Sequence, residues 1–305
     1  MAYGFLFTGD MHIRETVPPC RTDKFLKEQW RKLNFIAAYA KKHNLLWIDA
    51  GDVFHKAQPP LGFINNVLGT MHINGAKIHA GVYGNHDLPA HNINNANSSA
   101  WGTLYWGGII GDILCDEPCR CSWSDSLDIN VYGASYGEPI PTPKSIPYTM
   151  NVLVMHDMVY KSNNDIIPNT EGYLPTSILK SNPAYHLIVT GHNHQSFQAE
   201  MGQRMLVNVG CLTRQAADYA DHSPRVFVWR PQTGGMWVDV PHNKDVVSRE
   251  HIDKKEQKEE ELNAFVETLQ NVDDVSLSFE DNVEKVIQET QPEKPVVNKV
   301  KEAME

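Results

Sequence analysis

The sequence predicts a layered α/β fold in residues 1–244, followed by a short helical extension in residues 245–305. Short runs of β-forming residues alternate with helical patterns, which favours layers of helix against sheet. Apolar residues make up 41% of the 305 positions, enough for a large core. Two neighbouring β-forming runs close the first segment, and this hairpin suggests a second sheet with antiparallel edges.

Nine runs rich in β-branched and aromatic residues are the strand candidates. In chain order they span 3–8, 45–49, 77–82, 129–132, 151–155, 186–190, 205–209, 225–229 and 236–240. Residues 23–43 predict a long helix, because apolar residues from Phe25 to Ala37 fall on one stripe and Asp23 stands near the start.

The extension differs from the body in its charge. Residues 245–305 carry 17 acidic and 8 basic residues, whereas residues 1–244 carry 20 and 19. Most of the net charge of −10 therefore belongs to the extension. A near-neutral body neither excludes a phosphate-backbone partner nor supplies the basic patch that would indicate one.

The extension predicts two helices, at 249–270 and 280–289, each with a narrow apolar stripe. The stripes consist of Leu262, Phe265, Val266 and Leu269 in the first helix and of Val283, Val286 and Ile287 in the second. After Pro292 and Pro295 we expect a charged, flexible end. The stripes either dock onto the body or belong to an arm that binds a partner.

No membrane span and no secretion signal are expected. No run approaches the roughly 18 apolar residues of a spanning helix, and the first residues lack a basic region and a cleavage site. We therefore expect a cytoplasmic protein (host cytoplasm if viral) with reduced cysteines. Three of its five cysteines, Cys115, Cys119 and Cys121, cluster. A zinc site there would need a fourth ligand and tidier spacing, and surface thiols are the simpler interpretation.

Five polar clusters directly follow predicted strands. They are GDMH at 9–12, GDVFH at 51–55, GNHD at 84–87, MHD at 155–157 and GHNH at 191–194. Sites in α/β proteins gather outside the carboxyl ends of the strands, so these clusters are expected to meet at one rim. Four of these clusters begin with a glycine, directly before the candidate ligands, and this glycine permits a sharp turn and close backbone approach.

The residue types in these clusters fit a pair of divalent metal ions. Imidazole, carboxylate and amide donors together suit Mn²⁺, Zn²⁺, Fe²⁺ or Mg²⁺. Seven ligands are too many for one ion, and one bridging carboxylate would give each of two ions four protein ligands. The candidates are Asp10, His12, Asp52, Asn85, His156, His192 and His194. Each alone could be a turn or capping residue, but that interpretation would have to hold at five strand ends together.

The ordered set of five motifs resembles the calcineurin-like metallophosphoesterase superfamily, whose pattern is D-x-H, GD, GNH[DE], H and GH-x-H. The resemblance covers residues 9–194 and implies a four-layer αββα sandwich of two mixed sheets. It implies that Asp10, His12 and His194 hold one metal, that Asn85, His156 and His192 hold the other, and that Asp52 bridges them. It also implies that His86 protonates the leaving oxygen or stabilises the transition state, with Asp87 orienting its ring.

Within the superfamily, GDVFHKAQPP at 51–60 is similar to the SbcD-type DNA-repair nucleases, in a compact, phage-like version. This likeness implies a Mn²⁺-dependent exonuclease or endonuclease in DNA repair, recombination or replication. It implies an SbcC-type, SMC-like ATPase as partner, DNA as substrate and a homodimer. His55 would contact the substrate phosphate, although a polar residue at a helix start is the plain alternative.

The remaining expectations concern the substrate. Arg14, Lys56 and Arg214 stand near motif ends and could neutralise phosphates, or they could be ordinary surface charges. Because only about 60 residues follow the core, the extension is expected to be a reduced cap or a partner-binding arm. A small-nucleotide phosphodiesterase of the same fold and a non-catalytic partner-binding subunit are the alternative functions.

Overall fold

The computed structural model describes residues 4–124, 127–144, 146–250, 252, 257–264 and 279–304. The chain divides into two compact units, residues 1–246 and 247–305. Each unit is described by itself.

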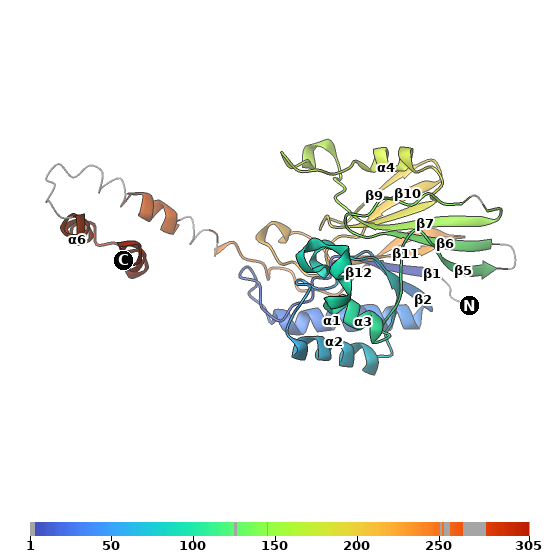
Figure 1. Ribbon diagram of the computed structural model, residues 1–305, viewed down its shortest axis with the longest axis horizontal. Coiled ribbons are helices and arrows are strands. Elements are labelled where there is room, and N and C mark those ends of the chain that lie inside the picture. The colour runs from blue at the N-terminus through green and yellow to red at the C-terminus, as the bar shows by residue number, and fades with distance from the viewer. Residues whose placement is uncertain are drawn as a thin grey trace. The chain divides into compact units, whose positions relative to one another are not determined.

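The first unit contains two six-stranded mixed sheets (Figure 1). The order of the first sheet is β12 (Gly234–Asp239), β11 (Arg225–Arg230), β1 (Gly4–Thr8), β2 (Leu45–Asp49), β3 (Ile78–Gly81) and β4 (Ile110–Ile113). The order of the second is β5 (Cys119–Ser124), β6 (Leu127–Ala134), β7 (Thr149–His156), β8 (Leu187–Gly191), β10 (Arg204–Asn208) and β9 (Phe197–Met201).

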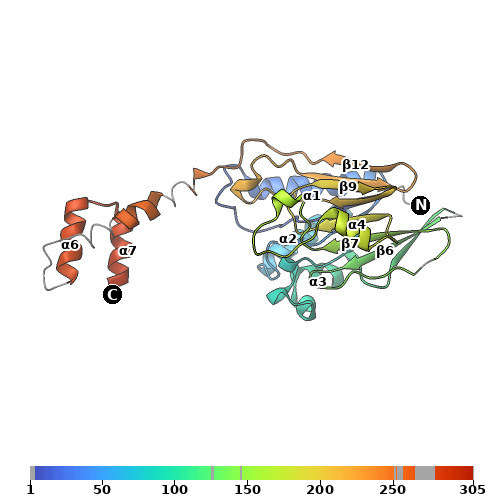
Figure 2. The same ribbon diagram turned by 90° about the horizontal axis from the view of Figure 1, so that it is seen from above.

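Helices cover the outer faces of the two sheets, so the unit is the expected four-layer sandwich (Figure 2). The helices α1 (Phe25–Lys42), α2 (Leu61–Ile73) and α3 (Ala100–Trp106) pack on the first sheet, and α4 (Pro175–Ser181) packs on the second. The inner faces of both sheets meet in one apolar cluster that includes Phe7, Ile48, Val154 and Val189. Strands buried on both faces explain why their sequences are nearly continuous apolar runs.

The closing hairpin lies in a different place from the one expected. Strands β11 and β12 do not begin a second sheet; β11 pairs antiparallel with β1, so the hairpin extends the first sheet. The second sheet takes its antiparallel edges from β5 and β9, which pair with β6 and β10. The prediction also missed β4, β5 and β9, whereas the helix predicted at 23–43 is confirmed by α1.

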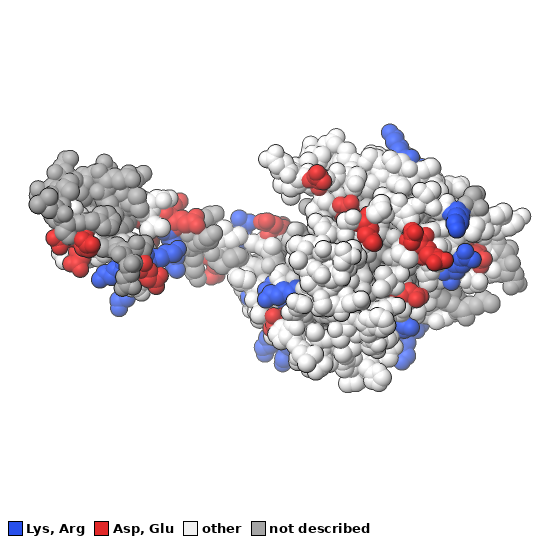
Figure 3. All heavy atoms as spheres, in the orientation of Figure 1, with Lys and Arg blue, Asp and Glu red and all other residues white. Residues whose placement is uncertain are grey.

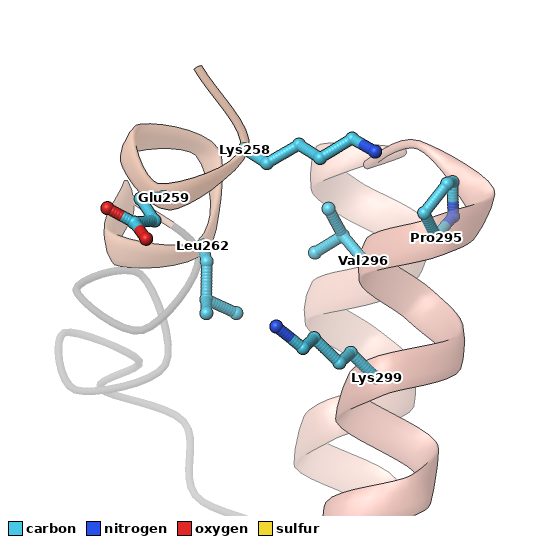
Figure 4. A pocket seen from close by; sticks show the side chains of 6 residues that line it. All are labelled: Lys258, Glu259, Leu262, Pro295, Val296 and Lys299. Carbon is cyan, nitrogen blue, oxygen red and sulfur yellow. The ribbon is translucent and has the colours of Figure 1, made fainter. Parts of the chain in front are cut away.

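The second unit is a group of helices. Residues 257–264 are helical, followed in the described chain by α6 (Phe279–Thr290) and α7 (Lys294–Met304). Val283 and Val286 are buried with Ile287 beside them, as the predicted stripe requires. The expected flexible end is instead helix α7. Phe265, Val266 and Leu269 of the first stripe lie outside the described residues. Leu262 lies opposite Val296, with Lys258 and Lys299 around the same pocket (Figure 4).

Two further expectations concern cysteines and membranes. Cys119 and Cys121 lie on edge strand β5, and Cys115 precedes it with its thiol turned to the Glu117 carbonyl. Within the described residues these three cysteines do not join any cluster of three potential metal donors. Over the same residues, no helix is both long and apolar enough to cross a bilayer.

Candidate metal centre

The five strand-end motifs lie together in the first unit. The loops after β1 and β2 run side by side, because Asp10 N–H donates to the Gly51 carbonyl and His12 N–H to the Asp52 carbonyl, each at 2.9 Å. The loop after β8 joins them through His192 N–H, which donates to the Asp10 carboxylate at 3.0 Å. The rim therefore combines residues from both sheets.

One donor cluster consists of Asp10, His12 and His194, whose potential ligand atoms all lie within 4.8 Å of one another. His12 Nε2 is 3.0 Å from His194 Nε2. The carboxylate oxygen Oδ1 of Asp10 lies 3.8 Å from the same His194 nitrogen. These are the three residues that the family resemblance assigned to the first metal.

A second donor cluster consists of Asp52, His156 and His192, again within 4.8 Å. The side-chain carbonyl of Asn85 adds a fourth donor, because its Oδ1 lies 3.0 Å from His192 Nδ1 and 3.2 Å from His156 Nε2. These residues, with Asp52 shared, are the set assigned to the second metal.

Asp52 lies between the two clusters. Its Oδ2 is 3.5 Å from His12 Nε2 in one cluster and 3.5 Å from His156 Nε2 in the other. Its second oxygen, Oδ1, accepts the His86 N–H at 2.8 Å. This position is the one that a bridging carboxylate needs.

The backbone at these positions is unusual. Asp10, His12, Asp52 and His192 all have positive φ, between 43° and 85°, a region that non-glycine residues seldom occupy. Such strain is found at functional sites, where the surrounding structure holds it. Gly84 is required for close packing, because a Cβ there would lie 2.1 Å from Asp52 Oδ1.

Buried polar contacts fix the orientation of the ligands. The Nδ1 of His156 lies 2.7 Å from the Ala50 carbonyl, so it carries the proton and Nε2 faces Asp52 and Asn85. This is the arrangement in which an outer hydrogen bond selects the tautomer of a metal-binding histidine.

Burial controls the charges of the clustered groups. It lowers the pKa of His192 and of His194 to about 4, and it lowers the pKa of His12 as well. These imidazoles are therefore neutral at pH 7 and offer lone pairs. Burial raises the pKa of Asp10 to about 8. Although burial alone would lower the pKa of His156, the Asp52 carboxylate raises it to about 10.

These features fit bound divalent cations. The Nε2 atoms of His12 and His194 face each other at 3.0 Å, and Asp10 Oδ1 lies 3.9 Å from the former, so their lone pairs can share one cation. Two buried carboxylates converge with four imidazoles, three of them neutral, and with one amide oxygen, a mixed nitrogen and oxygen donor set suited to Mn²⁺, Fe²⁺ or Zn²⁺. Cations there would compensate the carboxylates, which are otherwise costly to bury in charged form.

His86 lies beside the first cluster. Its ring is perpendicular to that of His12, with centroids 4.8 Å apart, and stacks on His55 at 5.4 Å. Its Nδ1 lies 2.8 Å from the His55 carbonyl, which leaves Nε2 to exchange a proton with a substrate. Burial, followed by the charge of Arg14, lowers the pKa of the His55 side chain to about 4.

The role expected for Asp87 is wrong. Its carboxylate does not orient the His86 ring, a function that the His55 carbonyl performs instead. Asp87 is fully buried and accepts three backbone N–H groups, from Asp52 at 2.7 Å, Gly84 at 3.0 Å and Phe54 at 3.2 Å. It therefore holds the loops after β2 and β3 together.

The three cations expected to bind substrate differ in their surroundings. Arg14 is half-buried at the edge of the site, and the exposed Lys56 ammonium lies 3.7 Å from the Glu15 carboxylate. Arg214 is only 3% exposed, and its guanidinium donates to the carbonyls of Ala220 and Asn243. The expectation for Arg214 is corrected accordingly, since its function is to hold loops rather than to meet a ligand.

Two aromatic residues that the sequence did not indicate flank the site. Tyr136 lies 5.8 Å from the His192 ring, and Tyr219 lies 5.1 Å from the His194 ring, between centroids. Tyr136 comes two residues after β6, the same strand-end position as the ligands. A search widened from metal donors to aromatic residues at strand ends would have found it.

Solved structures of other proteins align with this chain. A putative 5′-nucleotidase from Staphylococcus aureus aligns with a TM-score of 0.51 at 13% identity, over 85% of this chain and 58% of that one. This chain thus spans little more than half of that protein. A dimetal phosphatase from Danio rerio aligns with a TM-score of 0.45 at 10% identity, over 79% and 99% of the two chains.

Sequence comparison gives the family. No protein of curated function matches this sequence. Residues 3–196, however, match the calcineurin-like phosphoesterases as a family, and this segment contains every residue of the two donor clusters. The chain therefore belongs to the calcineurin-like phosphoesterase family and is a metal-dependent hydrolase of phosphoesters.

Proposed function

We propose that this protein is a DNA nuclease that hydrolyses phosphodiesters with two bound divalent ions, and that Mn²⁺ is the preferred ion. The observation that carries the proposal is the position of His55, whose ring stacks on His86 beside the first donor cluster. His55 belongs to the segment 51–60 that is similar to SbcD-type nucleases.

Two ions held by the clusters would polarise the phosphate and supply hydroxide near neutral pH. The protein's own groups do the rest. His86 gives a proton to the oxygen that leaves phosphorus, while the bond from phosphorus to the water oxygen forms. Because the His55 carbonyl accepts the Nδ1 proton, the proton given to the substrate is the one on Nε2 of the doubly protonated ring, and the Asp52 carboxylate fixes the His86 backbone.

Cations close to the site are the candidates for contacts with DNA phosphates. Lysine and arginine side chains are scattered over the face of residues 1–246 in Figure 3 and form no continuous basic patch on it. Arg14 and Lys56 lie at the edge of the site itself. Salt should therefore weaken DNA binding with a shallow slope, since few phosphates are neutralised.

The direct test is cleavage of 5′- and 3′-labelled duplex and single-stranded DNA over a panel of Mn²⁺, Mg²⁺, Zn²⁺ and Fe²⁺. Wild type should degrade DNA with Mn²⁺, and the Asp52→Ala and His86→Ala variants should not. His72→Ala, on an exposed position of α2, is the matched control. Turnover of cyclic or small nucleotides with DNA untouched would instead assign a small-nucleotide phosphodiesterase.

We further propose that the second unit binds the coiled coil of an SbcC-type ATPase and that the nuclease is a homodimer in that complex. The support is the likeness of residues 51–60 to SbcD-type nucleases and the acidic character of residues 245–305. Light scattering of the chain alone and with the ATPase tests both statements. A monomer that does not co-elute with the ATPase would refute them.

A further inference from the structure

Arg14 is held at the edge of the metal centre more firmly than a surface arginine requires. Its main chain is clamped by Gln29 of α1, a buried residue. The Arg14 N–H donates to Gln29 Oε1 at 3.1 Å, and Gln29 Nε2 donates back to the Arg14 carbonyl at 2.8 Å. Burying a polar side chain is unfavourable unless it is hydrogen-bonded. Both polar atoms of the Gln29 amide bond to the backbone of Arg14, so this buried side chain fixes the position of that residue.

The guanidinium of Arg14 is fixed as well. Its Nε and Nη2 donate to Thr16 Oγ1 at 3.0 and 2.8 Å, and Nη1 donates to Gln215 Oε1 at 3.0 Å. Gln215 in turn donates to the His12 carbonyl at 2.6 Å, which ties the cation to the loop of a metal ligand. These bonds engage three of the five N–H groups of the guanidinium and leave two for a ligand.

The loops place this cation next to His55. Ile13 N–H donates to the Val53 carbonyl at 2.9 Å and His55 N–H to the Ile13 carbonyl at 3.1 Å, so the two loops run in parallel. Arg14 then follows Ile13 as His55 follows Phe54. Lys56 comes next on the second loop, its side chain is 60% exposed, and its ammonium lies 3.7 Å from the Glu15 carboxylate. Glu15 is the nearby negative charge that acts on Arg14, but no carboxylate of the described residues forms an ion pair with Arg14. A pre-organised guanidinium without an ion-pair partner thus lies on the His55 side of the site.

We propose that Arg14 binds a second phosphate, the neighbour of the phosphodiester that is cleaved, and so makes oligonucleotides the preferred substrate class. The proposal rests on the phosphodiesterase function proposed above. The planar fork of a guanidinium matches two phosphate oxygens, and its fixed geometry lowers the entropy lost on binding. Gln29 and Gln215 are positioning residues that act through Arg14.

Small substrates test this directly. Steady-state kinetics with Mn²⁺ would compare bis(p-nitrophenyl) phosphate, dithymidine monophosphate, and the same dinucleotide with an added 5′- or 3′-terminal phosphate. In wild type, one of the two phosphorylated dinucleotides should have a kcat/KM about 10- to 100-fold above the unphosphorylated one, the range of a charge-assisted contact. Arg14→Gln should bring that ratio close to one. Gln215→Leu should lower the ratio mainly through KM, and Arg120→Gln, which removes an exposed charge on β5, should leave it unchanged.

The outcomes separate the two proposals. Hydrolysis of all substrates with no advantage from either terminal phosphate would overturn the second phosphate site and leave the phosphodiesterase intact. A ratio unchanged in Arg14→Gln would overturn it as well, since Arg14 would then only connect loops. If wild type hydrolyses none of the diesters, the proposed function fails and the phosphate site falls with it.

Discussion

The backbone N–H of His86 donates to the carboxylate of Asp52 at 2.8 Å. A hydrogen bond therefore links His86, the candidate proton donor, to Asp52, the candidate bridging ligand. Asp87 completes it by accepting the Asp52 N–H at 2.7 Å. A displacement of this backbone segment should therefore alter both the position of the bridging ligand and the position of the proton donor.

Asp87→Asn should destabilise the fold although the side chains are nearly isosteric. The amide replaces one acceptor oxygen with an NH₂ group, so at least one buried backbone N–H loses its partner, at a cost of about 1–3 kcal/mol. Urea unfolding should show the loss. Asp128→Asn, an exposed position on β6, should unfold as wild type does. Equal stability of all three proteins would contradict the structural role of Asp87.

His192→Ala and His194→Ala should each empty a different metal position. Their donor atoms belong to separate clusters, one with His156 and one with His12. Equilibrium dialysis with Mn²⁺ followed by elemental analysis should find about one ion fewer per chain in each variant. The same measurement on His72→Ala should match wild type. Loss of both ions in either single variant would show that the clusters do not bind independently.

His86→Gln should slow cleavage of DNA by about 10²- to 10⁴-fold, the usual contribution of a general acid. The loss should be far smaller for bis(p-nitrophenyl) phosphate, because p-nitrophenolate leaves without a proton. Metal content should stay at the wild-type level, since His86 belongs to neither the Asp10 nor the Asp52 cluster, although its ring lies within 4.8 Å of the donor atoms of His12 and His55. An equal loss on both substrates would argue against proton donation by His86.

Lys32 should make stability depend on pH. It is buried with its ammonium 2.5 Å from the Leu212 carbonyl, and burial lowers its pKa from 10.5 to about 7. Between these values the unfolded chain holds a proton that the folded chain has lost. The unfolding free energy should therefore rise from about pH 7 towards pH 10, by about a few kcal/mol from this group.

Comparison with Lys32→Met isolates this contribution from other titrating groups. Urea unfolding of both proteins at pH 6.5, 8 and 9.5 should show a stability gap that changes in favour of wild type as pH rises. Parallel curves would mean that the ammonium stays charged in the folded protein.

Arg214→Met should cost stability rather than substrate affinity. The guanidinium is buried and donates to the carbonyls of Ala220 and Asn243, which lose their partners in the variant. Thermal unfolding should shift down by several degrees for a loss of about 1–3 kcal/mol. The KM for DNA should remain that of wild type, in contrast to Arg14→Gln.

The candidate metal donors could be brought together from sequence because each motif is local and follows an apolar strand. The edge strands could not, since β9 and β5 are short and largely polar on one side and β4 contains a glycine. Helix α7 could not be predicted because two prolines and a run of charges indicate a flexible end, yet Pro295 stands in the first turn of the helix, where proline is tolerated.

The roles expected for Asp87 and Arg214 differ from those in the structure for another reason. Asp87 and Arg214 are charged residues near motifs, which is all that a sequence displays. Their partners are main-chain groups of segments up to 35 residues away, and only the folded chain brings these groups within reach. Neither polarity nor spacing could have distinguished them from Arg14, whose guanidinium stays at the edge of the site.

Each donor cluster takes residues from both sheets, and Asp10 meets His192 across 182 positions of chain. A complete site exists only when the sandwich has closed. Metal ions should therefore add little to the transition state for folding and much to the native state. Mn²⁺ should slow unfolding while the refolding rate stays the same, so the ions would prolong the lifetime of the folded protein without guiding its formation.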